Sequence, residues 1–265
     1  MSAGVGLWLG GALLALFFAW ILGHMQRTDA RLRTERVLKL TQRGLGELVP
    51  GEVNATRGAL RARAEPLTCP VDGAACVFYE LSLTRAGSVR GQARAPETVQ
   101  HTERYADAVV RDGDAAVGVA LRGARFTGHV REITREATFR DGEWLADTWE
   151  DGGWSGDERA FVDALGDGAR GELDAGTLTL RLRTLPPVDD ALVIGEALRS
   201  SSAAEGLTLG SSARFQLELT SGSLAHYQRA QQHALTTMQG ASRAFVALAV
   251  VLALLAGLTY AGVLG

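Results

Sequence analysis

The chain is short of the residues that build most metal and nucleotide sites. Cysteine occurs only at Cys69 and Cys76 in 265 residues, too few for a four-thiolate zinc site. The five histidines are scattered, and none has an HExxH-type spacing. No glycine-rich run ends in the GK[ST] of a phosphate-binding loop. We therefore expect no catalytic constellation, no cofactor and no bound metal.

Lysine is nearly absent as well. Lys39 is the only lysine among 27 basic residues, a bias that is typical of a GC-rich genome rather than of selected phosphate recognition. The formal net charge is −3, so the chain has no global basic field that would attract a polyanion. We expect no nucleic-acid partner.

Charge is missing altogether from two apolar runs at the ends of the chain, residues 4–23 and 244–264. Each is about 20 residues long, enough for a helix to cross a hydrocarbon core roughly 30 Å thick. The first run has no basic residue before it and no clean cleavage site after it, so we interpret it as a retained anchor rather than a signal peptide. The sequence predicts an integral membrane protein with two spans, in contact with the lipid bilayer.

Small residues recur every four positions in both runs. They form the stripes Gly11, Ala15, Ala19 and Gly23 in the first run, and Ala249, Ala253, Gly257 and Ala261 in the second. Such stripes allow helices to approach closely within lipid. We expect the two apolar helices to pack against each other.

Basic residues lie only on the inner side of the two runs. They are Arg27, Arg31, Arg33, Arg36, Lys39 and Arg43 after the first run, and Arg229 and Arg243 before the second. Because cytoplasmic flanks of membrane spans carry the excess of Lys and Arg, this pattern predicts a cytoplasmic central domain. In that compartment we expect Cys69 and Cys76 to be reduced thiols.

Between the two runs, the pattern predicts a mainly β domain. Segment 47–222 contains short strand-like runs such as VFYELSL and RFQLELT, separated by Gly, Asp or Pro, with a short helix over 158–165. Segments 25–46 and 223–243 are predicted as long helices that continue into the transmembrane helices 1–24 and 244–265. The predicted fold class is α+β, with a barrel-like or sandwich-like central domain.

One stretch of this domain combines tryptophan with acidic residues. Residues 141–158 (DGEWLADTWEDGGWSGDE) contain seven carboxylates and no basic residue. Oxygen-rich loops can hold Ca²⁺, but this spacing does not match an EF-hand. The candidate partner-contact residues are Trp144, Trp149, Trp154, Asp147, Glu150 and Asp151. The alternative interpretation is an acidic surface loop whose tryptophans fold back onto the domain's own core.

The run 53–85 (VNATRGALRARAEPLTCPVDGAACVFYELSLTR) resembles the opening of the GIDE domain, also called the "beside a membrane" domain. That opening has a glycine-containing strand, a proline-bearing turn and a C-V-x-Y strand. The matching positions here are Gly58, Pro70, Cys76, Val77 and Tyr79. Segments 105–124 and 185–198 resemble later strands of the family, the second including its V-x-G step at 193–195.

The resemblance implies an architecture more than an activity. Eukaryotic members with this layout are E3 ubiquitin ligases of mitochondrial and chloroplast outer membranes, whose activity belongs to a RING finger after the second span. A RING needs about eight Cys and His ligands, and this chain offers only two cysteines. The resemblance also implies a domain that faces the intermembrane space, contrary to the placement that the charges predict.

The sequence therefore favours a membrane-anchored, non-catalytic binding or scaffold protein with an unidentified protein partner. Three alternatives stay open: an enzyme whose site is assembled from dispersed residues, a ubiquitin-ligase-like protein that takes its RING from another chain, and a subunit of a larger membrane complex. A deep pocket with converging carboxylates or histidines would favour the enzyme.

Overall fold

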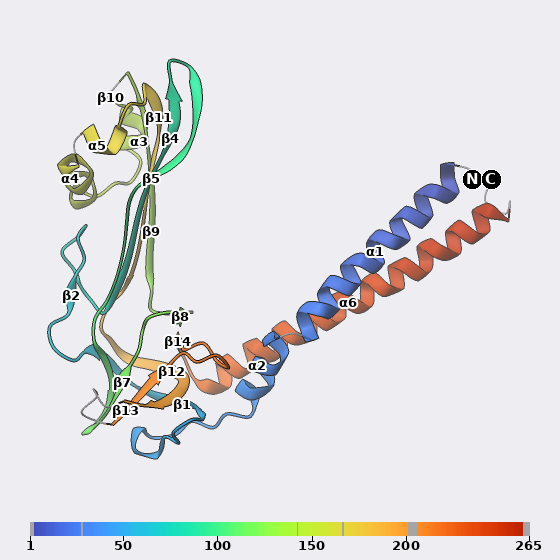
Figure 1. Ribbon diagram of the computed structural model, residues 1–265, viewed down its shortest axis with the longest axis horizontal. Helices are drawn as coiled ribbons and strands as arrows, with labels where there is room; N and C mark the ends of the chain where they lie inside the picture. Colours follow the sequence, from blue (N-terminus) through green and yellow to red (C-terminus); the bar gives the residue numbers. More distant parts are fainter. Residues whose placement is uncertain (1–2, 28, 142, 166, 201–205, 262–265) are drawn as a thin grey trace. The chain divides into compact units, whose positions relative to one another are not determined.

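A computed structural model describes residues 3–27, 29–141, 143–165, 167–200 and 206–261. It divides into two compact units, one formed by residues 42–222 and the other by residues 1–41 together with 223–265. The first unit is mainly β and the second is helical (Figure 1). The protein is thus α+β with mostly strands, which confirms this part of the predicted fold class.

The β unit contains a small closed barrel, one of the two architectures expected. Five strands pair in the ring order β1, β6, β7, β13 and β12, and β12 pairs back to β1. All these pairings are antiparallel except that of β7 with β13. The strands are β1 (Val53–Ala62), β6 (Ala108–Asp112), β7 (Ala115–Val119), β12 (Val188–Arg199) and β13 (Leu207–Gly210). Two short strands, β14 (Glu218–Thr220) and β8 (Arg125–Phe126), continue the sheet beyond β12.

Closure of the barrel depends on glycine in β1. This strand pairs with β12 from Val53 and with β6 from Ala59, and its register shifts just after Gly58. A Cβ atom at Gly58 would lie 2.4 Å from the carbonyl oxygen of Arg111. Only glycine therefore lets the two backbones approach this closely where β1 bends from one neighbour to the other.

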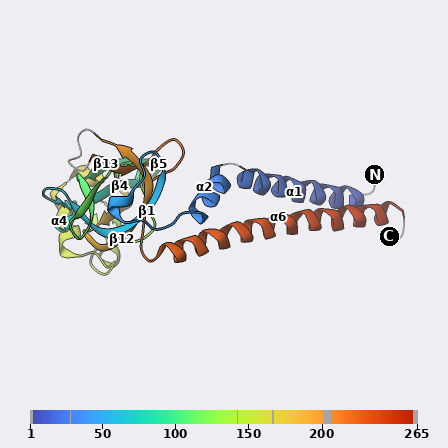
Figure 2. The same cartoon turned by 90° about the horizontal axis from the view of Figure 1, so that it is seen from below.

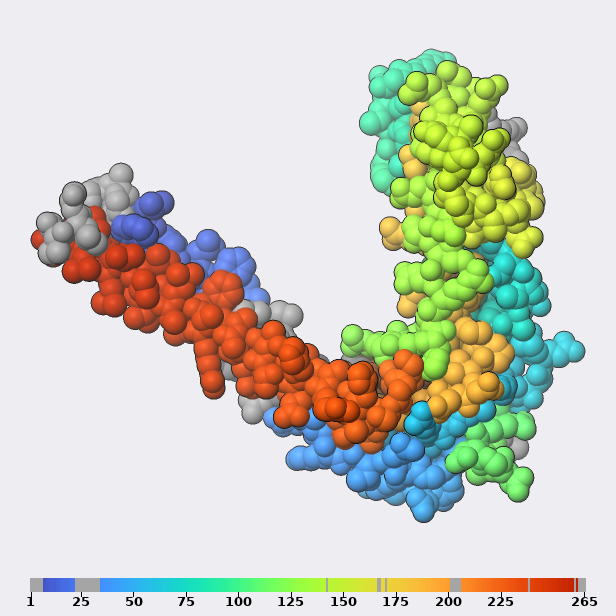
Figure 3. Space-filling model, turned by 180° about the vertical axis from the view of Figure 1, so that it is seen from behind, coloured from blue at the N-terminus to red at the C-terminus, as the bar shows by residue number. Residues whose placement is uncertain are grey.

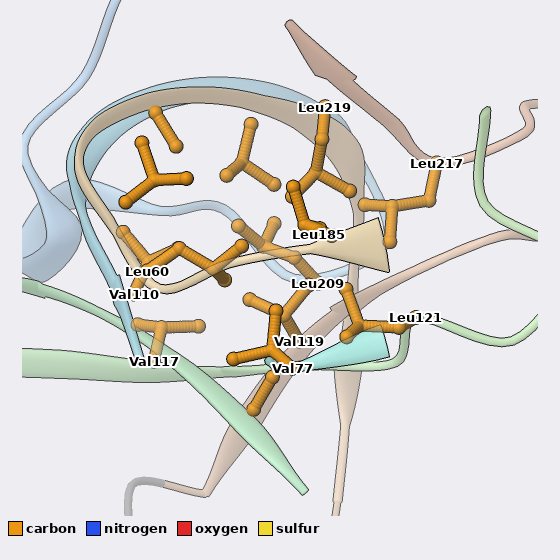
Figure 4. Close-up of a cluster of buried hydrophobic side chains, with 14 of the residues drawn as sticks. Leu60, Val77, Val110, Val117, Val119, Leu121, Leu185, Leu209, Leu217 and Leu219 are labelled. Carbon is orange, nitrogen blue, oxygen red and sulfur yellow. The ribbon is translucent and has the colours of Figure 1, made fainter. Parts of the chain in front are cut away.

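Apolar side chains from every strand of the ring belong to one buried cluster, and Figure 4 shows those of β1, β6, β7 and β13 converging inside the barrel. Leu60, Val110, Val117 and Leu209 are at most 3% exposed. Residues 191–195 of β12 are buried without a break, so both faces of this strand are covered. A strand covered on both faces needs a continuous apolar run rather than an alternating one.

A second, five-stranded sheet extends from the barrel in the order β10, β9, β11, β4 and β5. Its strands are β10 (Glu143–Trp144), β9 (Arg131–Arg140), β11 (Ala175–Leu185), β4 (Phe78–Val89) and β5 (Gln92–Tyr105). One face carries a separate apolar cluster that includes Leu81, Leu83, Leu178, Leu180 and Leu182. A hairpin and three short helices pack residues into this cluster. The hairpin consists of β2 (Leu67–Thr68) and β3 (Ala75–Cys76), and the helices are α3 (Ala146–Trp149), α4 (Gly156–Ala164) and α5 (Asp167–Arg170).

The helical unit consists of α1 (Ala3–Arg27), α2 (Asp29–Leu38) and α6 (Leu224–Tyr260). Helices α1 and α6 lie side by side in both ribbon views (Figure 2). Gln228 links α6 to the end of α2, because its Nε2 donates to the carbonyl oxygens of Val37 and Leu40, each at 2.9 Å. The predicted helix 25–46 is too long. The chain leaves α2 after Leu38, and Arg43 N donates to Ala55 O at 2.9 Å, which attaches this segment to the barrel.

Small residues line the contact between α1 and α6, but the predicted stripe on α6 is wrong. On α1, Ala15 and Ala19 are buried as expected; the side chain position of residue 23 lies outside the described residues. On α6, Ala249 and Ala256 are buried, whereas Ala253 is exposed. The seven-residue step from Ala249 to Ala256 returns to within about 20° of the same face of the helix, whereas repeated four-residue steps drift by about 40° each.

One helix, Leu224–Thr259 within α6, is long and apolar enough to cross a membrane by length and composition. The apolar part of α1 among the described residues is shorter, Leu7–Ile21. Two spans are therefore not established by the structure. A core helix or a leader sequence can meet the same criterion, so α6 alone supports membrane insertion only weakly.

Candidate functional site

The three candidate tryptophans come together on the five-stranded sheet, each from a different element. The Trp144 and Trp149 rings are stacked, with centroids 4.7 Å apart and planes 10° apart. Trp154 packs beside Trp149 at 5.0 Å, and Phe139 of β9 meets the edge of Trp144 at 5.4 Å. The three tryptophans are five residues apart in sequence, a spacing that suits neither a strand face nor a helix face. Their rings nevertheless meet, because β10, α3 and the following loop supply one ring each.

Backbone hydrogen bonds attach this segment to the outer side of β9. Leu145 N donates to Thr138 O at 2.8 Å, and Thr138 N donates to Thr148 Oγ1 at 2.9 Å. The chain then turns sharply at Gly152, where a Cβ would lie 2.0 Å from the carbonyl oxygen of Thr148. The turn returns the chain to the sheet and so places Trp154 against Trp149.

The three rings differ in how deeply they are buried. Trp154 is 4% exposed, and its Nε1 donates to Glu136 O at 3.2 Å. This ring belongs to the apolar cluster of the sheet, as the alternative interpretation expected. Trp144 and Trp149 are only partly buried, so their rings alone offer surface to a partner.

The carboxylates of the segment are divided in the same way. Asp147, Glu150 and Asp151 are exposed, and no ion pair involves them in the described part of the chain. Glu158, in contrast, is buried, pairs with Arg135 at 3.2 Å, and completes the capping box of α4. We call the group of Trp144, Trp149, Asp147, Glu150 and Asp151 the tryptophan face. The segment forms part of the molecular surface (yellow-green in Figure 3).

Cys69 and Cys76 are brought together by the β2–β3 hairpin, where Leu67 is paired with Cys76 and Cys69 N donates to Ala74 O. Both are free thiols and 1% exposed. Burial raises the pKa of Cys69, and it raises the pKa of Cys76 to about 11. Both side chains are therefore protonated, unreactive members of the apolar cluster. Within the described residues, no three His, Cys, Asp or Glu side chains form a group that could hold a metal ion.

A cleft that the sequence did not indicate lies where the five-stranded sheet meets the barrel. Its volume is about 490 Å³. Phe78 forms its floor, stacked 4.8 Å from Phe126 and 5.1 Å from Tyr105. Burial and a hydrogen bond to Glu103 raise the pKa of the Tyr105 hydroxyl to about 12.

Both carboxylates that line the cleft are already engaged within it. Glu80 pairs with Arg183 at 2.8 Å, and Glu103 accepts the hydrogen bond from Tyr105. The lining comes from β4, β5, β8 and β11 and from the loop residues Gly123, Ala124 and Gln216. No local pattern could reveal it, because strand pairing alone brings these distant segments together.

Three comparisons with known proteins found no match. No family model, no curated protein and no solved structure matches this chain.

Proposed function

We propose that the chain is a membrane-anchored, non-catalytic binding or scaffold protein with a GIDE-like central domain, and that its tryptophan face receives a basic or amphipathic segment of a protein partner. The observation that carries this proposal is a stacked pair of partly exposed indoles, on the same short segment as three exposed carboxylates that have no basic partner among the described residues. Tryptophan is enriched among the residues that dominate binding energy.

The chemistry of the face defines the partner. An apolar side chain can cover the Trp144 and Trp149 rings, and a guanidinium or ammonium group can reach Asp147 and Glu150 at the rim. Charged rims mainly accelerate association and select partners, and their effect weakens as salt rises. Binding should therefore depend on salt through the association rate, while the tryptophans determine how long the complex lasts.

The membrane part of the proposal rests on α6, whose apolar window is mostly exposed, and on the second uncharged run at residues 4–23. We propose that both runs insert and that the β unit is cytoplasmic. An alkaline phosphatase fusion in the exposed β6–β7 turn at Gly113 tests this orientation. Low phosphatase activity is expected, and high activity would show a domain on the opposite side of the membrane.

The binding test uses the full chain in nanodiscs and a synthetic arginine-rich amphipathic peptide, with tryptophan fluorescence as the readout. Asp147→Asn/Glu150→Gln should weaken binding. The matched control, Asp112→Asn/Asp114→Asn, removes two exposed carboxylates from the β6–β7 turn and should leave binding unchanged. Equal loss in both variants would indicate unspecific attraction, and no binding of the wild-type chain would contradict the proposal.

The dispersed enzyme site remains the second candidate, because the cleft beside Tyr105 brings Glu80, Glu103 and Arg183 together. The binding function is preferred, since both carboxylates are engaged within the cleft and neither faces a histidine there. Turnover of any substrate that is lost in Glu103→Gln would reverse this preference. A ligase-like function would require a RING from another chain, and ubiquitin transfer by a reconstituted complex would support it.

A further inference from the structure

The five-stranded sheet has one covered edge and one open edge. At the covered edge, Leu145 and Trp154 donate hydrogen bonds to carbonyl oxygens of β9. At the other edge lies β5, which pairs with β4 on one side and with no strand of the described residues on the other (Figure 1). An open edge presents unpaired peptide groups that can pair with another chain.

The two halves of β5 differ in their ability to accept a strand. The first half contains Pro96, and its register with β4 shifts between Arg85 and Gly87; a second shift, between Leu83 and Thr84, leaves Val99 without a partner in β4. Proline and bulges protect an edge from pairing. The second half, residues 99–105 (VQHTERY), contains no proline, and residues 100–105 pair with 83–78 in continuous register.

The backbone direction of each residue in this half follows from the hydrogen bond of Ala106 N to Val77 O, 2.9 Å long. In an antiparallel pair, residues that bond to the neighbour alternate with residues whose N–H and C=O point away. The backbone N–H and C=O of Thr102 therefore point towards β4. His101, Glu103 and Tyr105 direct their peptide groups to the open edge.

We propose that residues 100–104 of β5 pair antiparallel with the same residues of a second copy of this chain, about a two-fold axis at Thr102. This register places His101 of each copy opposite Glu103 of the other, and Gln100 opposite Arg104. An axis at Glu103 would place two carboxylates face to face, and an axis at His101 would leave Glu103 opposite Val99. A histidine opposite a carboxylate can donate a hydrogen bond to it, whereas two carboxylates directly opposite each other repel.

The central pair of this arrangement provides a specific test. Thr102 of one copy faces Thr102 of the other as a non-hydrogen-bonded pair, with Cα atoms about 4.5 Å apart. This distance lies within the Cα–Cα range of a disulfide. Thr102→Cys should therefore give covalent dimers when membranes containing the full chain are mildly oxidised. Thr98→Cys is the matched control on the same strand. Its two copies would lie eight residues apart along the ladder, about 27 Å at 3.4 Å per residue, and should not cross-link.

The charge pairing is tested in the Thr102→Cys chain. Adding His101→Glu places carboxylates opposite each other twice and should reduce the dimer yield several-fold. Adding Glu103→His as well exchanges the two partners and should restore the yield. Failure of the double exchange to rescue, with the wild-type melting temperature retained, would overturn the register.

The wild-type chain provides a measurement that needs no variant. Its mass in detergent, by light scattering, should be that of two chains. A monomeric mass, or equal cross-linking at positions 98 and 102, would overturn the proposal. The tryptophan face lies at the other side of the sheet, beside β9 and β10, so peptide binding there can succeed or fail independently of self-pairing.

Discussion

Substitution of the buried carboxyl of Glu218 should stabilise the protein in a pH-dependent way. Glu218 lies on β14 between Leu217 and Leu219, both members of the barrel core. Its own side chain therefore points to the opposite face of the sheet, where it is 1% exposed. Burial raises its pKa from 4.5 to about 7.

The sign of the effect follows from proton linkage. Because the folded-state pKa lies above the unfolded value, the folded chain binds more protons than the unfolded chain between about pH 4.5 and 7. The contribution of the protonated Glu218 carboxyl to stability is therefore fully present below this pH window and is lost as the pH rises through it. A difference of 2.5 pKa units (7 minus 4.5) corresponds to about 3 kcal/mol above pH 7, at 1.36 kcal/mol per unit.

Glu218→Gln removes the charge but keeps the size of the side chain. We expect it to raise the free energy of unfolding by about 3 kcal/mol at pH 8 and to have almost no effect at pH 4. With roughly 2–4 °C per kcal/mol for a domain of this size, the melting temperature at pH 8 should rise by roughly 6–12 °C. The assay is thermal unfolding of the full chain in detergent, followed by tryptophan fluorescence.

Glu132→Gln is the control, since Glu132 is an exposed strand residue and its substitution should change little at either pH. A destabilised Glu218→Gln at pH 8 would show that the ionised carboxylate is held by the fold. An equal gain at both pH values would show that burial does not control its protonation. Either result would refute the reasoning.

Three further predictions concern Trp154, the two cysteines and the two apolar runs. Trp154→Ala should lower the free energy of unfolding by about 3–5 kcal/mol, as expected for a buried aromatic residue. Trp154→Phe keeps an aromatic ring but loses the hydrogen bond to Glu136 O, worth about 1 kcal/mol, and part of the packing, so it should cost less than Trp154→Ala in urea titration; equal costs would mean that packing is not the main contribution. Cys69 and Cys76 should resist N-ethylmaleimide in the folded chain and give two adducts after unfolding, read by intact mass; rapid labelling of the folded chain would show an open hairpin. The full chain should stay in the membrane pellet after a carbonate wash, because extracting uncharged spans from lipid is costly, and release into the supernatant would refute both anchors.

Some features were predictable because they depend on neighbours in sequence. The uncharged run of residues 244–264 predicted the apolar end of α6, and the composition of segment 47–222 predicted strands and a barrel or sandwich. The short helix expected over 158–165 is α4, which begins two residues earlier, at Gly156, after the N-cap Ser155 that forms the capping box with Glu158. The tryptophan–acid segment was also visible, but its division into core and surface was not.

The sequence by itself determined the local choices: strand, helix or turn, and apolar or charged. Those choices follow from side-chain periodicity and backbone preference within a few residues. Tertiary structure alone decided which strands close the barrel, that Trp154 is buried while Trp144 and Trp149 stay partly open, and that Glu80, Glu103 and Arg183 share a cleft. It also decided that β5 is left as an open edge. These outcomes depend on pairing between segments far apart in the chain, where register and close approach at positions such as Gly58 select one arrangement among many that satisfy the same local pattern.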